Sequence, residues 1–118
     1  MKNYLVFSMA ALLVGASCST KQEKAAEGFT GAPGEVKLIT LDPGHFHAAL
    51  VQKVSYPQVS KDVHVYAPTG FDVDEHLKRI QGFNTRAENP TAWNEIVYTG
   101  GDYLEKMLAE KKGNVMIQ

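Results

Sequence analysis

The 118 residues of this chain are enough for one folded domain at most, and 12 Lys or Arg side chains stand against 13 Asp or Glu. This balance leaves no basic patch, and the aromatic residues are not interleaved with Lys or Arg, which argues against nucleic acid as a partner. Cys18 is the single cysteine, which excludes an intramolecular disulfide bond.

The first 17 residues have the organisation of a secretory signal peptide. Lys2 gives a positive start, and residues 4–16 form an apolar run of about thirteen residues, shorter than the roughly twenty that span a bilayer. The small residues 15–17 before Cys18 resemble the lipobox of bacterial lipoproteins, in which the cysteine becomes the mature N-terminus and carries acyl chains. We therefore predict an exported protein whose Cys18 is lipid-anchored to the bacterial cell envelope, periplasmic or outer-membrane. An ordinary signal peptide with an incidental cysteine is the alternative.

Residues 18–34 are predicted to form a flexible tether, because polar and small residues dominate this stretch and it can bury little apolar surface. Cleavage after residue 17 would remove one basic residue, Lys2, and leave 11 basic and 13 acidic residues with a formal charge of −2. The folded part of the chain is then predicted at residues 35–118.

The first predicted elements are a strand, a tight turn and a helix. Residues 36–41, VKLITL, are apolar and strand-like, Asp42-Pro43-Gly44 forms the turn, and a helix is predicted from His45 to about Val54. Helical spacing would place Phe46, Ala49 and Val54 on one face of that helix. This is the opening of a βαβ unit, in which chemistry sits at the carboxyl end of the strand.

Strands and helices are predicted to alternate along the rest of the chain. The predicted strands are residues 62–67, 95–99 and 114–118, and the predicted helices occupy about 72–83 and 102–112. Asp72 with Glu75, and Asp102 with Glu105, have the spacing of capping boxes. Gly82 lies where a glycine cap would end the first of these helices.

Alternating strands and helices predict an α/β fold, a Rossmann-like three-layer sandwich with a mainly parallel sheet of about four strands and flanking helices. Residues 84–94 are predicted to form an irregular loop, with Trp93 packed back on the sheet. A parallel strand normally leads into a loop at its carboxyl end, and none follows the last strand. We therefore expect residues 35–118 to be a partial domain, incomplete at the C-terminus, of a longer protein.

A dinucleotide-binding fingerprint, G-x-G-x-x-G, would place its glycines at Asp42, Gly44 and His47, so only the middle glycine is present. The carboxylate of Asp42 would face a phosphate, and His47 would fill space that the third glycine leaves open. The acid that binds ribose is also missing, because residues 66–68, Tyr-Ala-Pro, stand at the end of the second strand. These residues predict weak or absent binding of NAD or NADP, and a gain in binding for Asp42→Gly.

Residues 36–118 nevertheless resemble the N-terminal domain of the Gfo/Idh/MocA oxidoreductases, and more closely a lipoprotein branch of that family. The resemblance rests on LITLDPGHFHAALVQK, HVYAP, HLKRIQGFNTRAENPTAW and VYTGGDYLEKMLAEKKGNVMI. It implies an NAD or NADP cofactor, a sugar or related polyol as substrate and a separate C-terminal substrate domain. The family's catalytic lysine lies beyond the fourth strand, so no catalytic residue is assigned. The implied cofactor-binding residues are Asp42, Gly44, His45, Phe46 and His47.

Two other functions remain open. His45-Phe46-His47 after a first strand is also the first metal-ligand motif of amidohydrolase-type hydrolases, with Asp42, His64 and His76 as further candidates. If the helix already begins at His45, however, the two histidines point about 200° apart, which favours a structural or surface role over a metal site. The other alternative is a non-catalytic exported binding module that has kept the fold and lost the cofactor, as the missing glycines would allow.

Overall fold

The computed structural model describes residues 28–118. The predicted signal peptide, the predicted lipid anchor at Cys18 and most of the predicted tether lie outside the described residues. Inside this range, none of the helices has the length and apolar character that a membrane span requires.

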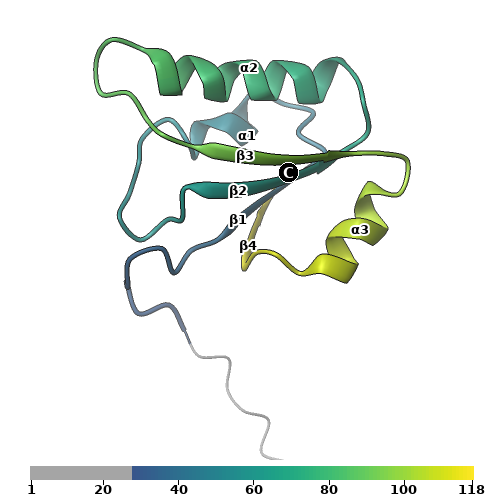
Figure 1. Ribbon diagram of the computed structural model, residues 1–118, viewed down its shortest axis with the longest axis horizontal. Coiled ribbons are helices and arrows are strands. Elements are labelled where there is room, and N and C mark those ends of the chain that lie inside the picture. Colours follow the sequence, from purple (N-terminus) through teal and green to yellow (C-terminus); the bar gives the residue numbers. More distant parts are fainter. Residues whose placement is uncertain (1–27) are drawn as a thin grey trace, which may run out of the picture.

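Four parallel strands form one sheet in the order β3-β2-β1-β4 (Figure 1). The strands are β1 (Leu38–Leu41), β2 (Asp62–Ala67), β3 (Asn94–Thr99) and β4 (Val115–Ile117). Thr40 of β1 pairs with Val65 on one side and with Ile117 on the other. The α/β prediction with a parallel sheet of four strands is confirmed, and β2 has the predicted bounds.

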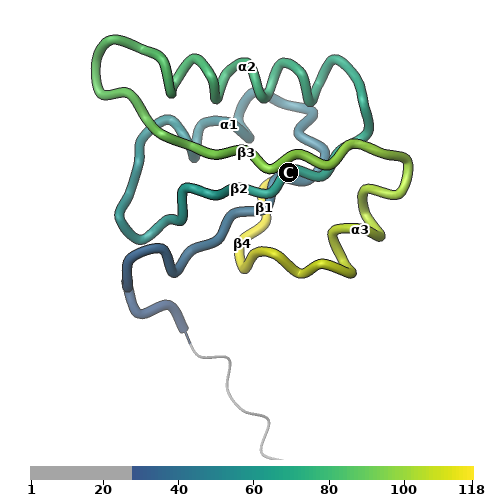
Figure 2. The backbone as a smooth tube through the Cα atoms, viewed as in Figure 1, coloured from purple at the N-terminus to yellow at the C-terminus, as the bar shows by residue number. Residues whose placement is uncertain are grey.

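Helices cover both faces of this sheet, which makes three layers (Figures 1 and 2). α1 (His47–Leu50) and α2 (Phe71–Thr85) lie on one face, and α3 (Tyr103–Glu110) lies on the other. Each helix belongs to the connection between two parallel strands, as a parallel sheet requires. We refer below to the α1/α2 face and the α3 face of the sheet.

Alternation along the strands divides the core between the two faces. Leu38 of β1 packs with Val63 of β2 and Ile80 of α2. The next residue of β1, Ile39, packs on the other face with Met107 of α3. Successive strand residues point to opposite faces, so every second residue serves the same layer. Trp93 is 6% exposed and belongs to the α1/α2 cluster, which confirms its predicted packing on the sheet.

The first helix is much shorter than predicted: α1 covers four residues, not the stretch from His45 to Val54. After Leu50 the chain forms a turn, with Gln52 N–H donating to Ala49 O at 3.0 Å. Ala49 is fully buried, but Phe46 and Val54 are each 50% exposed. The helical spacing of these apolar residues was therefore misleading, because they do not share one buried face.

The predicted capping boxes are also wrong. α2 begins at Phe71 after Gly70, whose φ of 154° suits glycine, and no side chain caps it, so Asp72 lies inside the first turn. Asp102 is at the N-cap position of α3 but makes no side-chain cap hydrogen bond; its Oδ1 accepts a hydrogen bond from the Tyr98 hydroxyl at 2.6 Å. Gly82 lies within α2, which continues to Thr85.

The described end of the predicted tether, residues 28–34, contacts the folded part. The Glu35 carboxylate accepts three hydrogen bonds from the backbone N–H groups of residues 30–32, at 2.7 to 3.0 Å. These bonds lower the pKa of Glu35. Gly34 N–H donates to Pro57 O at 2.9 Å, so hydrogen bonds join the chain to the domain just before β1.

Candidate functional site

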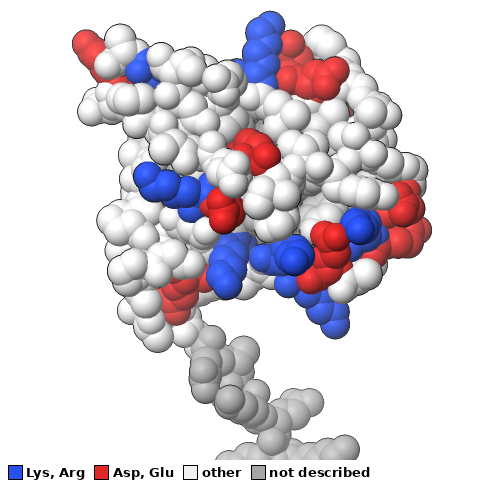
Figure 3. Space-filling model, viewed as in Figure 1, with Lys and Arg blue, Asp and Glu red and all other residues white. Residues whose placement is uncertain are grey.

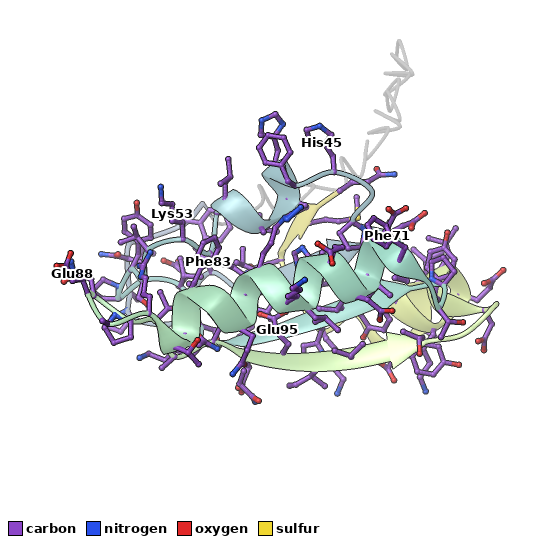
Figure 4. The ribbon with its side chains drawn as sticks, turned by 90° about the horizontal axis from the view of Figure 1, so that it is seen from above. His45, Lys53, Phe71, Phe83, Glu88 and Glu95 are labelled. Atoms are coloured by element: carbon purple, nitrogen blue, oxygen red, sulfur yellow. The ribbon has the colours of Figure 1, made fainter. Side chains whose placement is uncertain are left out.

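A cleft of about 90 Å³ lies at the carboxyl end of β1 and β2. One wall is the turn after β1, residues 43–46, and the other wall is the first half of α2. The residues of the second wall are Phe71, Asp72, Glu75, His76 and Arg79. Figure 4 labels one residue of each wall, His45 beside α1 and Phe71 at the start of α2.

The turn after β1 is shaped by Asp42 rather than by Gly44. Asp42 has a left-handed φ of 43°, a conformation that Asp tolerates better than most residues, and its N–H donates to Tyr66 O at 2.9 Å. Gly44 has no such φ, and a Cβ there would meet nothing within 4 Å. Within the described chain, no contact therefore requires glycine at position 44, and its open surface is free for a ligand to approach.

Three aromatic rings cluster at the exit of this turn. The rings of His45 and His47 are 4.4 Å apart between centroids, and Phe46 lies 4.1 Å from His47. Phe46 is 50% exposed, so this cluster presents an apolar ring to solvent. The helix begins at His47 and not at His45, so the condition under which the two histidines would point about 200° apart is not met.

The two histidine rings are close together, but further metal ligands do not join them. Within residues 28–118, no three His, Cys, Asp or Glu side chains lie together in a way that could hold a metal ion. Asp42, His64 and His76, the other candidate ligands, are therefore not assembled around His45 and His47. The described residues therefore contain no metal site of the kind that the metal-dependent hydrolase hypothesis requires.

The most distinctive residue of the second wall is His76. Its side chain is 4% exposed, yet neither Nδ1 nor Nε2 has a hydrogen-bond partner. Burial, followed by the positive charge of Arg79, lowers the pKa of His76, so the ring is neutral at neutral pH. A neutral imidazole carries one N–H donor and one acceptor. In His76 neither the donor nor the acceptor has a partner, and the ring lines the cleft.

The charges around the cleft are mixed. Arg79 is exposed and lies at 4.0 Å from Glu75, which is also 3.5 Å from Lys78. Asp72 and Asp74 occupy the first turn of α2, where they offset the positive end of the helix dipole. Such a mixture favours a ligand with hydroxyl and ring nitrogen groups over a bare anion. On the face shown in Figure 3, acidic and basic side chains are likewise interleaved.

Of the five predicted cofactor-binding residues, Gly44, His45 and Phe46 line this cleft, while Asp42 and His47 do not. The carboxylate Oδ2 of Asp42 is 3.4 Å from the Tyr103 hydroxyl at the start of α3. The sequence interpretation did not assign Arg79 to a site, and it offered His76 only as a metal ligand. A histidine between buried Val73 and Ile80, at helical spacing, was the available signal for a buried ring.

The residues present could form one wall of a nucleotide site rather than a complete one. Pockets that bury a whole ligand usually measure about 300–1,000 Å³, several times the volume of this cleft. The open surface at Gly44 allows close backbone approach, and His76 offers an unused donor and acceptor. α1 is too short to provide a useful helix N-terminus for a phosphate.

Comparison with solved structures finds one similar protein, described as a "putative oxidoreductase" from Parabacteroides merdae ATCC 43184. The sequences are 98% identical over 76% of this chain, and the TM-score is 0.75. The match covers 20% of that protein, so this chain spans about a fifth of its length. No protein-family model matches the chain, and no curated protein matches it.

Proposed function

We propose that this chain forms the nucleotide-binding part of an exported oxidoreductase of the Gfo/Idh/MocA type. One observation carries the proposal, namely 98% identity to part of a protein described as an oxidoreductase. The sequence resemblance in residues 36–118 adds the family, NAD or NADP as the cofactor and a sugar or polyol as the substrate class. A membrane anchor at Cys18 is proposed from the sequence pattern alone.

The position of the cleft agrees with this proposal. From β1 the chain runs to β2 and β3 on one side of the sheet, and β4 pairs with the other side of β1. The strand order therefore reverses at β1. In open α/β sheets, ligands bind outside the carboxyl ends of the strands near such a reversal. The cleft lies at the same carboxyl edge, on the β2 side of the reversal, between the turn after β1 and the start of α2.

The residues of this chain would bind and orient the cofactor, which when bound supplies the hydride-transfer chemistry. His76 can donate to and accept from hydroxyl or ring nitrogen groups, because it is neutral and both its nitrogens are unpaired. The exposed rings of Phe46 and Phe71 provide apolar surface on the two walls. Arg79 is the cation that lines the cleft.

We expect the affinity of this chain alone for NAD or NADP to be weak. The cleft is small, and a four-residue helix gives little dipole stabilisation to a phosphate. If the Asp42 carboxylate faced the phosphate at about 4 Å, repulsion would cost about 4 kcal/mol at an effective dielectric constant near 20. Residues from the rest of a longer protein would complete the site.

The test is a titration of the chain with NAD and NADP, followed by NMR shifts of the backbone amides. We expect the shifts to concentrate in residues 43–46 and 71–79. Arg79→Ala should weaken binding, while Lys78→Ala is the matched control, because Lys78 also lies near Glu75 but does not line the cleft. Shifts elsewhere, or equal losses in both variants, would contradict this site.

The proposed anchor needs its own test, because Cys18 lies outside the described residues. Cys18→Ala should abolish fatty-acid labelling and move the protein from the membrane to the soluble exported fraction. If labelling and membrane association survive the substitution, the lipoprotein proposal is contradicted. The oxidoreductase proposal is not affected by that result.

A non-catalytic binding module is the second candidate, and Asp42 and His47 favour it because they replace two of the three fingerprint glycines. The two candidates make different predictions for the longer protein. An oxidoreductase should bind NAD or NADP and reduce it when sugars or polyols are supplied. A binding module should bind such a ligand without any change in nicotinamide absorbance.

A further inference from the structure

A buried and a half-buried polar side chain connect the end of α1 to the sheet, away from the cleft. Gln52, in the turn after α1, is completely buried, and its Nε2 donates a hydrogen bond to Oε1 of Glu95 in β3. Glu95 lies opposite Val63 in the sheet, on the face that α2 covers. Figure 4 shows Glu95 beside α2.

Each side chain also holds a buried oxygen that has no partner. Oε1 of Gln52 and Oε2 of Glu95 are both acceptors, and neither receives a hydrogen bond. A carboxylate and an amide oxygen cannot satisfy one another, because neither carries a hydrogen. Buried acceptors without donors are rare and costly, and one proton placed between these two oxygens would satisfy both.

None of the neighbouring side chains can supply that proton or a compensating charge. The indole N–H of Trp93 already donates to the backbone oxygen of Gln52 at 2.6 Å. Asn84 of α2 is occupied by Thr91 and Trp93. No titratable side chain other than Glu95 lines the hollow between α2 and β3, whose remaining residues are Leu77, Ile80, Gln81, Asn94 and Val97.

We propose that Glu95 is protonated in the folded chain and forms a cyclic acid–amide pair with Gln52, and that loss of this proton loosens the turn after α1. In this pair, Oε2–H of Glu95 donates to Oε1 of Gln52, while Nε2 of Gln52 donates to Oε1 of Glu95. One proton then satisfies both of the unpaired oxygens. The pair is a pH-sensitive contact between α1 and β3.

The electrostatics of the site agree with a proton that is exchanged near neutral pH. Burial raises the pKa of Glu95 to about 7, although the hydrogen bond from Gln52 acts in the opposite direction. A glutamate in water titrates near 4.3. Glu95 would therefore change charge in a range where most carboxyl groups are already ionised.

The pair is one of three hydrogen-bonded contacts that join the turn after α1 to side chains of other described segments. The other two are the Trp93 bond to Gln52 O and the bond from Arg86 Nη2 to Lys53 O, each at 2.6 Å. Deprotonation of Glu95 removes the bond from its Oε2–H to Gln52 and leaves a buried negative charge, while the Nε2 bond from Gln52 and the other two contacts remain. α1 leads back to the turn at residues 43–46, so a looser turn would make one wall of the cleft more mobile. This last step concerns the proposed function, whereas the protonated pair does not depend on it.

An NMR titration of the 118-residue chain between pH 5 and pH 9 tests the pair directly. We expect the side-chain carboxyl carbon of Glu95 to titrate with a midpoint near pH 7, and the side-chain amide of Gln52 to shift with the same midpoint. Exchange protection of the Gln52 and Lys53 backbone amides should fall roughly five-fold above that midpoint, after correction for intrinsic exchange, as the loss of about one hydrogen bond predicts.

Two variants make the test specific. Glu95→Gln has nearly the same shape and cannot ionise, so it should remove the pH dependence of the Gln52 amide and of the protection. Glu88→Gln changes an exposed glutamate in the loop after α2 and should leave both unchanged. A Glu95 midpoint near 4.5, a Gln52 amide that does not follow it, or the same loss of protection in Glu95→Gln would each overturn the proposal. Loss of cofactor binding alone would not.

Discussion

The two faces of the sheet differ in whether their buried polar groups have hydrogen-bond partners. On the α1/α2 face, side chains of β1, α2, β3 and the turn after α1 hold polar atoms without partners, namely those of Thr40, Gln52, His76 and Glu95. On the α3 face, the Tyr66 hydroxyl donates to Glu110 at 2.5 Å, and Glu110 also pairs with Lys106 at 3.0 Å. Within residues 28–118, the unpaired buried atoms thus gather on one face.

This difference indicates which face of the sheet lacks hydrogen-bond partners for its buried polar groups. Buried polar groups are nearly always hydrogen-bonded in native structures, so unpaired ones mark a proton, a ligand or a neighbouring segment that completes them. The α3 face already satisfies its own hydroxyl and carboxyl groups. The α1/α2 face holds both the candidate cleft, through His76, and the proposed proton site, through Gln52 and Glu95.

The largest expected effect is a fall in stability with rising pH that arises from Glu95. Its pKa is raised to about 7 in the folded chain, so between about pH 4.5 and 7 the unfolded chain loses a proton that the folded chain keeps. The unfolded state therefore binds fewer protons, and stability decreases through this window, by at most about 3 kcal/mol. Urea unfolding of the parent chain and Glu95→Gln at pH 5 and pH 8 measures it.

The Glu95→Gln variant should be more stable than the parent chain at pH 8 and should differ little at pH 5. Glu110, on the α3 face, gives the opposite sign. Hydrogen bonds from Tyr66 and Lys106 lower the pKa of Glu110, so its contribution is lost as pH falls, not as pH rises. A Glu95→Gln variant with the same pH profile as the parent would remove the distinction between the two faces.

The next effect concerns His76, whose two unpaired nitrogens carry a desolvation cost. His76→Leu removes both and should stabilise the chain by about 1–2 kcal/mol at neutral pH, since each unsatisfied buried group costs about 1–3 kcal/mol and some packing is lost. The pKa of His76 is lowered, so the gain should grow as pH falls below about 6.5. Thermal unfolding at pH 5.5 and 7.5 measures both.

The same variant should bind NAD or NADP more weakly if His76 contacts the ligand. His76→Asn is the control, because it keeps a donor and an acceptor in the cleft and should retain more of the binding than Leu. Lower stability in His76→Leu would show that the ring nitrogens are satisfied in solution.

Much of the fold could be predicted from the sequence because its signals are local. β2 is a β-branched run closed by Pro68, and its bounds were predicted correctly. The end of α1 could not be predicted in this way, because Phe46 and Val54 have helical spacing but no partner to bury them. Similarly, Asp72 has capping-box spacing, yet Gly70 allows the helix to begin one residue earlier.

The candidate site was predictable only in its first wall. The strand and turn at residues 36–44 point to the carboxyl edge of the sheet from sequence alone. The second wall depends on how α2 is rotated on the sheet, which decides that His76 lines the cleft, and spacing within α2 does not specify this. Glu95 alternates with Val97, which hinted at the α2 side, but its contact with Gln52 spans 43 residues of sequence.

A smaller effect is expected when a side-chain hydrogen bond on the α3 face is removed. Tyr66→Phe leaves the ring in the core and removes the hydroxyl that donates to Glu110, so stability should fall by about 1 kcal/mol at pH 7. Burial, helped by Glu110, raises the pKa of Tyr66 to about 12, so the hydroxyl should remain protonated throughout. Urea unfolding measures the loss.

Tyr98→Phe is the matched control, because the Tyr98 hydroxyl also donates to a carboxylate, that of Asp102, but in an exposed position. We expect its loss to be about half as large or less, since exposed groups can bond to water instead. A stabilised Tyr66→Phe variant would mean that the α3 face, too, carries a strained polar group.

The smallest effect is expected at Asp42, which stands where the two faces meet. Its backbone shapes the turn that leads into the cleft, while its carboxylate Oδ2 is 3.4 Å from the Tyr103 hydroxyl on the α3 side. Glycine accepts a φ of 43° without strain but has more freedom in the unfolded chain, so Asp42→Gly should change stability by less than about 1 kcal/mol. If the carboxylate stays with Tyr103, binding of NAD should change by less than about two-fold. Calorimetric titration decides the point: a gain of tenfold or more, about 1.4 kcal/mol, would show that Asp42 faces the phosphate and belongs to the cleft.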